Sequence, residues 1–334
     1  MKLLVTGGAG FIGSNFIRYW LAKYPKDEIV NLDKLTYAGR LETTKDFSGE
    51  KNYKFIKGDI ADLKTVRKAI AGVDVVVNFA AESHNDRAIQ DPGIFVRTNV
   101  LGTQLLLEEA RREGVKRFHH ISTCEVFGEL ELDEKKAFKE EDPFRPRTPY
   151  NASKASANHI VMAYFHTFSL PVTVSHCSNN FGPYQFPEKI IPRFITNLID
   201  DREIPLYKSS QNKREWIYVD DHNRAVDFII HKGKEGEAYN IGTGIEKSVE
   251  DIADAILKIF NKTNVYKKYV PDRLGHDKRY LLDITKIHKE LKWKPLNEFD
   301  KWLEKTVKWY EKNEWWWRPL KGKAEELYKQ TGQI

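Results

Sequence analysis

The chain has 334 residues, of which 41% are apolar and 31% charged, and its formal net charge is +6. This composition is typical of a globular protein and excludes wholesale disorder. No apolar run approaches the roughly 20 residues that a membrane-spanning helix needs. The lysines are dispersed among 48 acidic residues, without a basic stripe. We therefore expect neither a membrane nor a nucleic acid as a partner.

Strands and helices alternate along the first half of the chain. Apolar, β-branched runs predict buried strands at 3–6, 28–32, 53–56, 73–79, 117–122 and 172–177. Helices are predicted between them at 11–24, 62–71, 93–113 and 149–169. This alternation predicts an α/β fold with a doubly wound parallel sheet of the Rossmann type.

Beyond residue 178 the pattern becomes irregular and rich in proline. We predict that residues 1–178 form the Rossmann domain, to which segments at about 216–241 return. Residues 179–215 and 242–334 are predicted to form a smaller C-terminal α/β lobe. The run Trp315-Trp316-Trp317 is expected to seal a core or a subunit contact.

A glycine-rich turn follows the first predicted strand and opens the first helix. Its glycines at positions 7, 10 and 13 let the backbone approach a pyrophosphate, which would rest on the helix N-terminus. Asp33, at the end of the second predicted strand, is placed to bind the ribose hydroxyls of an adenosine and to repel a 2′-phosphate. The predicted cofactor is therefore NAD.

The ends of the other parallel strands supply further cofactor contacts, because ligands bind beyond the carboxyl ends of such strands. The third strand end is predicted to hold the adenine, and the fourth to pass beneath the pyrophosphate or nicotinamide. The residues predicted to bind the cofactor are Gly7, Gly10, Phe11, Ile12, Gly13, Asp33, Lys34, Thr36, Asp59, Ile60, Ala80, Ala81, Ser83, Thr98, Ser122, Tyr150, Lys154 and Asn179.

Tyr150 and Lys154 are four residues apart at the start of the predicted helix 149–169, so they share one helix face. There the ammonium can lower the phenol's pKa, which makes the tyrosine a base for a sugar or alcohol hydroxyl. Just upstream, Thr123-Cys124-Glu125 adds a thiol and a carboxylate as a second acid–base pair.

Only one other cysteine, Cys177, occurs in the chain, so no disulfide framework is possible and a reducing cytoplasm is the expected location. No histidines and cysteines have metal-ligand spacing, and no metal is expected.

Together with the glycine turn, these residues make the chain resemble the extended short-chain dehydrogenase/reductase superfamily. Four longer segments are similar to those of the dTDP-glucose 4,6-dehydratase family. They are residues 80–87 (AAESHNDR), 178–189 (SNNFGPYQFPEK), 214–222 (REWIYVDDH) and 272–277 (DRLGHD). One position departs from the family, which carries Thr-Asp-Glu where this chain has Thr123-Cys124-Glu125.

The resemblance implies an NAD-dependent hydro-lyase of deoxysugar biosynthesis that converts dTDP-glucose to dTDP-4-keto-6-deoxyglucose. Tyr150, held by Lys154, would remove the proton of the 4-hydroxyl as hydride passes from C4 to NAD, with Thr123 bound to O4. Glu125 would take the C5 proton, water would leave across C5–C6, and hydride would return to C6. Cys124 stands where the family has its acid, and is either that acid or a small packing residue.

For the substrate, the resemblance places Asn180, Lys189 and Arg214 near the nucleotide diphosphate. Asn240, Asp272 and His276 would lie near the base and ribose. The residues predicted to bind substrate are Ser83, Thr123, Asn180, Lys189, Ile190, Pro205, Tyr207, Arg214, Asn240, Asp272 and His276.

The same resemblance implies a homodimer joined through two helices per subunit, and NAD that is recycled within each turnover. The Thr-Cys-Glu triplet is also similar to that of UDP-N-acetylglucosamine 5,6-dehydratases, which return the hydride to C4. A UDP-N-acetylglucosamine 5,6- or 4,6-dehydratase, a nucleotide-sugar epimerase and a non-catalytic NAD-binding protein are therefore alternatives.

Overall fold

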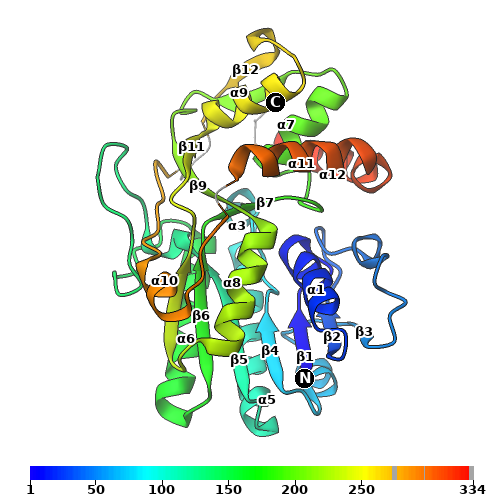
Figure 1. The fold of residues 1–334 in the computed structure, drawn as a ribbon, viewed down its shortest axis with the longest axis vertical. Coiled ribbons are helices and arrows are strands. Elements are labelled where there is room, and N and C mark those ends of the chain that lie inside the picture. Colours follow the sequence, from blue (N-terminus) through cyan, green and yellow to red (C-terminus); the bar gives the residue numbers. More distant parts are fainter. Residues whose placement is uncertain (273–276, 297, 331–334) are drawn as a thin grey trace.

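A computed structural model describes residues 1–272, 277–296 and 298–330 of the chain. Its lower part is built on a seven-stranded sheet with the strand order β10-β6-β5-β4-β1-β2-β3 (Figure 1). The strands are β1 (Lys2–Thr6), β2 (Glu28–Asp33), β3 (Tyr53–Lys57), β4 (Val75–Asn78), β5 (Arg117–Thr123), β6 (Val172–Cys177) and β10 (Glu237–Ile241). Every pairing in this sheet is parallel. The predicted doubly wound Rossmann sheet is confirmed.

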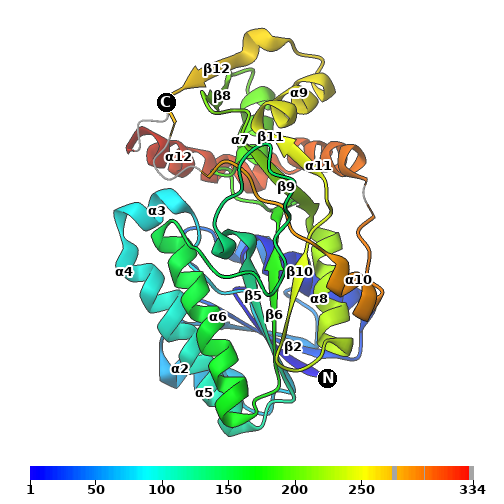
Figure 2. The same cartoon turned by 90° about the vertical axis from the view of Figure 1, so that its left-hand side faces the viewer.

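Helices cover both faces of this sheet (Figure 2). α1 (Phe11–Lys23) and α8 (Val219–Lys232) pack together on one face. The other face carries α2 (Leu63–Ile70), α5 (Thr103–Glu113) and α6 (Pro149–Phe168). Side chains alternate along β1, where Leu3 and Val5 face α1 and Leu4 faces the opposite layer. Because both faces of the sheet are covered, its strands are continuous apolar runs in the sequence. This is why the strands could be predicted from the sequence.

The predicted helix at 93–113 is helical throughout, but it is not an α-helix over its whole length. In the structure α3 (Asn85–Gln90) and α4 (Pro92–Phe95) lead into a π-helical segment, Val96–Gly102, before α5 begins. At its end the helix passes very close to the loop after β3, since a Cβ on Gly102 would lie 2.6 Å from Ile60 Cγ1. Periodicity alone did not reveal this change of pitch, because the apolar residues continue through it.

A smaller lobe lies above the carboxyl ends of the strands (Figure 1). It contains a three-stranded sheet, β11-β9-β7, and a two-stranded sheet, β12-β8. These strands are β7 (Asn179–Phe181), β8 (Ile204–Tyr207), β9 (Lys213–Tyr218), β11 (Glu246–Ser248) and β12 (Lys267–Val270). The lobe's helices are α7 (Ile190–Ile199), α9 (Val249–Ile259), α11 (Phe299–Lys312) and α12 (Glu314–Gln330).

The chain crosses between the two parts more than once. β10 pairs with β6 of the central sheet and α8 packs beside α1, whereas β9, whose last residues fall in the predicted returning segment, pairs with β7 and β11 in the upper lobe. α10 (Thr285–Leu291) contacts β10 and α8, so this later segment also lies beside the lower part (Figure 2). None of the helices within the described ranges has the length and apolarity needed to cross a membrane.

The tryptophan run seals the core of the upper lobe. Trp316 and Trp317 are buried there, and Trp315 is half-exposed. The Trp317 indole donates a hydrogen bond to the Tyr310 carbonyl (2.8 Å), and the Trp316 indole donates to Thr43 Oγ1 (3.1 Å). The expected packing role is confirmed for two of the three residues, and Trp316 also ties the lobe to the loop after β2.

Three buried histidines, in β5, β6 and α8, make the stability of the fold depend on pH. His119 lies between Thr173 Oγ1 (2.9 Å) and Ser175 Oγ (3.1 Å) on the neighbouring strand. Burial lowers the pKa of His119 and His176 to about 3 and that of His222 to about 4. These rings are therefore neutral in the folded protein at pH 7.

We expect the free energy of unfolding to fall as the pH drops from 7 to 5. The unfolded chain binds protons on these histidines below pH ~6.5 and the folded chain does not, so each contributes a loss of about 2 kcal/mol over that interval. Urea unfolding at both pH values measures the change, and His222→Leu should remove about one third of it. A free energy that stays constant between pH 7 and 5 would contradict this assignment.

Candidate active site

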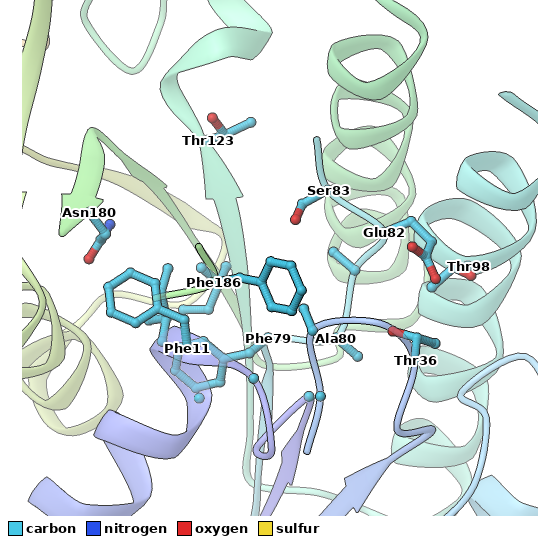
Figure 3. A pocket seen from close by; sticks show the side chains of 18 of the residues that line it. Phe11, Thr36, Phe79, Ala80, Glu82, Ser83, Thr98, Thr123, Asn180 and Phe186 are labelled. Atoms are coloured by element: carbon cyan, nitrogen blue, oxygen red, sulfur yellow. The ribbon is translucent and has the colours of Figure 1, made fainter. Parts of the chain in front are cut away.

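A cavity of about 370 Å³ lies beyond the carboxyl ends of the central strands (Figure 3). All the residues predicted to bind the cofactor line it. Phe11 and Phe186 lie at one side of it in Figure 3 and Thr36 and Thr98 at the other, with Thr123 above. The structure thus brings these residues together at one cavity, and the sequence indicated them because strand ends are recognisable from the apolar runs that precede them.

The glycine turn is shaped to receive a phosphate. Gly7 has a φ of +69°, and a Cβ on Gly13 would lie only 2.5 Å from the Gly7 carbonyl oxygen. No side chain caps the start of α1, where Gly10 is the N-cap. The first backbone N–H groups of that helix therefore point toward the cavity without a side-chain acceptor, as pyrophosphate binding requires.

Asp33 ends β2 and lines the same cavity. Its carboxylate accepts hydrogen bonds from the N–H groups of Ala9 (2.9 Å) and Leu35 (2.8 Å), while burial raises its pKa. The two backbone bonds fix the carboxylate beside the glycine turn. Nearby, Asp59 forms an ion pair with Lys34 (3.0 Å). The turn, the uncapped helix and the fixed carboxylate together fit a dinucleotide such as NAD.

Tyr150 and Lys154 lie on α6 where it passes the end of β5. The Lys154 ammonium donates to the Ile121 carbonyl oxygen (2.7 Å) and lies 3.4 Å from His120 Nε2. Burial lowers the pKa of Lys154 to about 8. Burial and the charge of Glu125 raise the pKa of Tyr150 well above its ordinary value. The expectation that the lysine lowers the phenol's pKa was therefore wrong, because the largest effect on the phenol is its desolvation.

Thr123 sets the local geometry of the triplet. It ends β5 and caps a short 3₁₀ turn, Cys124–Phe127, by accepting the Glu125 N–H on Oγ1 (3.2 Å). The turn directs Thr123 and Glu125 into the cavity, which both residues line. The residue between them is turned to the opposite side.

Cys124 is accordingly buried and lines neither this cavity nor the adjoining one. It belongs to an apolar cluster with Val126, Phe127, Leu130, Phe138, Ala155, Tyr280 and Leu282. Burial raises the thiol's pKa well above its ordinary value. Of the two interpretations of Cys124, the geometry favours the packing residue over the acid.

A second cavity of about 210 Å³ adjoins the first and extends into the upper lobe. Tyr150 and Glu125 line both cavities. The predicted substrate residues that line the second cavity are Ser83, Lys189, Ile190, Pro205, Tyr207 and Arg214, and those that line only the first are Thr123 and Asn180. Tyr150 and Glu125 thus stand where the first cavity joins the one that extends into the upper lobe.

Arg214 is one of three cationic residues that line the second cavity, together with three carboxylates. The guanidinium is held by the carbonyl oxygens of Asp277 (2.6 Å) and Lys213 (2.8 Å). Arg193 also lines the cavity and lies over the Tyr328 ring at 3.3 Å from its centroid. Fixed arginines suit the oxygens of a diphosphate. Sequence reasoning missed Arg193 and Tyr328, whose separation in the chain gave no signal that they meet.

Two predicted substrate residues are not brought to either cavity. Asn240 is fully buried in β10, and its amide donates to the carbonyl oxygens of Phe138 (2.9 Å) and Asp283 (3.3 Å). Asp272 accepts the Ser209 N–H (2.9 Å) and lines neither cavity. His276 lies outside the described residues. Asn240 therefore ties neighbouring loops to the edge strand β10 and does not line a cavity, contrary to the prediction.

Cys177 also lines the first cavity, although from the sequence it was considered only as a possible disulfide partner. It ends β6 and lines the cavity, and its thiol donates to the Ser122 carbonyl oxygen (3.2 Å). Burial raises its pKa to about 12, so it stays a protonated thiol. It is therefore part of the wall and not a nucleophile.

Comparison with known proteins agrees with this geometry. The model of the family described as GDP-mannose 4,6 dehydratase matches residues 4–306. A dTDP-glucose 4,6-dehydratase of Mycobacterium tuberculosis is 45% identical over 334 residues, which cover 100% of both chains. The crystal structure of a dTDP-glucose 4,6-dehydratase of Streptomyces venezuelae with NAD bound has a TM-score of 0.93 and 44% identity, covering 96% of this chain and 100% of that one.

More distant structures share the fold with a different reaction. A UDP-glucose 4-epimerase of Thermotoga maritima is 27% identical with a TM-score of 0.86, covering 93% of this chain and 99% of that one. The Rossmann sheet, the glycine turn and the Tyr150–Lys154 pair define an extended short-chain dehydrogenase/reductase. Within that class, the chain belongs to the GDP-mannose 4,6 dehydratase family.

We expect Cys124→Ala to keep turnover within about threefold of the wild type, because the thiol lies outside the cavities, and to cost about 1 kcal/mol of stability. Cys124→Asp should destabilise by more than about 2 kcal/mol, since it buries a carboxyl in the apolar cluster. Steady-state rates and urea unfolding of both variants measure these effects. A folded Cys124→Ala protein that has lost about a hundredfold in rate would show that the thiol transfers a proton.

Proposed function

We propose that the protein is an NAD-dependent dTDP-glucose 4,6-dehydratase, a hydro-lyase that forms dTDP-4-keto-6-deoxyglucose. The observation that carries the proposal is the meeting of Glu125 and Tyr150 where the two cavities join, with Thr123 beside them in the first cavity. An oxidoreductase needs only the tyrosine and lysine there. The carboxylate is the additional group that an elimination needs.

Bound NAD supplies the chemistry of hydride uptake from the sugar C4 and hydride return to C6, and its cationic nicotinamide ring favours an ionised phenol beside it. Tyr150 takes the proton of the 4-hydroxyl as the C4–H bond is oxidised to a ketone. The Lys154 ammonium, which the Ile121 carbonyl oxygen holds in place, supplies a positive charge on the same helix face as Tyr150. Thr123 Oγ1 is placed to hydrogen-bond the developing oxygen at C4.

Glu125 then acts on the acidified C5–H bond. It takes the C5 proton, the electron pair forms the C5–C6 double bond, and the C6 hydroxyl leaves. The leaving oxygen needs a proton to depart as water. Because Cys124 lies outside the cavities, the proton that Glu125 has just taken is the nearest one available for this step. One carboxyl group thereby serves as base and acid in turn. When hydride is added at C6, C5 takes up a proton again; this balances the proton that Tyr150 removed from the 4-hydroxyl, so the atoms balance without the thiol.

The division of labour follows the two parts of the fold. Residues 1–178, with the returning segments at about 216–241, bind NAD, and residues 179–215 and 242–334 bind the nucleotide sugar. A homodimer forms through α6 and the helical segment from α4 to α5, on which Val96 and Leu101 are exposed apolar residues. The enzyme works in the cytoplasm, in deoxysugar biosynthesis, and keeps its NAD through each turnover.

A second candidate is a 5,6-dehydratase acting on UDP-N-acetylglucosamine, favoured by the cysteine within the Thr-Cys-Glu triplet. It requires the same Tyr150, Lys154 and Glu125 and differs in returning the hydride to C4. An epimerase is less well supported, because Glu125 would then have no proton to transfer.

Incubation with dTDP-glucose and, separately, with UDP-N-acetylglucosamine tests the assignment. Proton NMR of the product from dTDP-glucose should show a C6 methyl doublet, because hydride returns to C6. Vinyl protons of an exocyclic alkene, formed from the UDP sugar alone, would establish the second candidate instead. A protein that binds NAD and turns over neither sugar would contradict both.

A further inference from the structure

Asn85 connects Glu125 to the start of the helix that carries Tyr150. It is the first residue of α3, is 8% exposed and lines the second cavity. Its Nδ2 donates a hydrogen bond to Glu125 Oε2 (3.2 Å), and its Oδ1 accepts one from Thr148 Oγ1 (2.7 Å). Thr148 is the N-cap of α6, the helix that carries Tyr150. A chain of two hydrogen bonds thus joins the carboxylate of the elimination to the helix of the redox step.

The hydrogen bonds determine which way the amide points. Thr148 Oγ1 accepts the Asn151 N–H (3.2 Å), and its single hydrogen goes to Asn85 Oδ1. The NH₂ group of Asn85 must then face Glu125. An ionised carboxylate is an acceptor only, so this donor favours the charged form of Glu125, which is the form that can take a proton.

The backbone next to Asn85 is held in an unusual conformation. His84, a buried non-glycine residue, has a φ of +103°. Such a conformation is unfavourable for a side chain with a Cβ and persists where surrounding contacts enforce it. Its effect is to turn the chain sharply after Ser83, which Figure 3 shows beside the cavity, so that α3 starts with Asn85 against Glu125.

We propose that Asn85 is a positioning residue for the elimination: it keeps Glu125 ionised and fixes it relative to the start of α6. This role rests on the proposed function of Glu125 as the base for C5. Helix capping does not require Asn85, because Thr148 already caps α6 through the Asn151 N–H. Asn85 therefore contributes the hydrogen bond to the Glu125 carboxylate, and the cap of α6 is made by Thr148 without it.

The size-matched variant Asn85→Leu removes the donor and tests the role. We expect kcat to fall about 10- to 100-fold with little change in KM, because a hydrogen bond to a charged group is lost. The acid limb of the pH–rate profile should move up by about one pH unit. The isotope effect from deuterium at C5 should increase and that from deuterium at C4 should not, because only the C5 step depends on Glu125.

Two further variants sharpen the test. Asn85→Asp places a second carboxylate against Glu125, so its acid limb should lie above that of Asn85→Leu. Asn158→Leu is the matched control: this buried asparagine on α6 binds His176 (3.2 Å) and lines neither active-site cavity. Its acid limb and isotope effects should equal those of the wild type.

A measurement without substrate separates this proposal from the assignment of the reaction. The ¹³C carboxyl signal of Glu125 in the NAD-bound protein is assigned by its absence in Glu125→Gln, and its titration needs no turnover. We expect a midpoint about one pH unit higher in Asn85→Leu than in the wild type. Equal midpoints in proteins with matching thermal transitions would overturn the proposal. If Asn85→Leu does not fold, Asn85→Ser is titrated in its place, with the same two outcomes.

Discussion

The parallel pairing of the seven central strands is the constraint on which the rest of the structure depends. Because every strand runs the same way, all the carboxyl ends open at one edge of the sheet. Residues that are far apart in the chain, such as Asp33, Thr123 and Cys177, therefore border one cavity. The helices on both faces keep water from the strands, and the upper lobe covers the open edge (Figure 1).

A short turn at the end of β5 converts this edge into a site for elimination. The Thr123 hydroxyl accepts the Glu125 N–H, and the resulting 3₁₀ turn divides three consecutive side chains between two environments. Thr123 and Glu125 enter the cavity, and Cys124 enters an apolar cluster. Asn85 approaches the same carboxylate from the end of β4. The end of β5 thus places Thr123 and Glu125, and α6, which packs against β5, places Tyr150 and Lys154 at the same cavity.

Most of the lower part could be predicted from the sequence, because strands buried on both faces are continuous apolar runs and the glycine turn has a fixed relation to β1 and α1. The cofactor cavity followed from those strand ends. Asn240 was misplaced because its position in β10 depends on hydrogen bonds to Phe138 and Asp283, which no local pattern announces.

Electrostatics were the other point at which the sequence was insufficient. The four-residue spacing of Tyr150 and Lys154 correctly placed both at the site, and spacing carries no information about desolvation. Burial and the neighbouring Glu125 carboxylate raise the phenol's pKa. The role of Asn85 was hidden for a similar reason, since its two partners lie far away in the chain.

The most direct test of the central claim is the separation of oxidation from elimination at Glu125. Glu125→Gln protein with bound NAD, mixed with dTDP-glucose, should accumulate the absorbance of reduced nicotinamide while forming about 100-fold less 4-keto-6-deoxy product than the wild type. That result would show that Tyr150 and Lys154 suffice for the redox step and that the carboxylate is needed for the elimination. Product formation within a few-fold of the wild type would contradict the account.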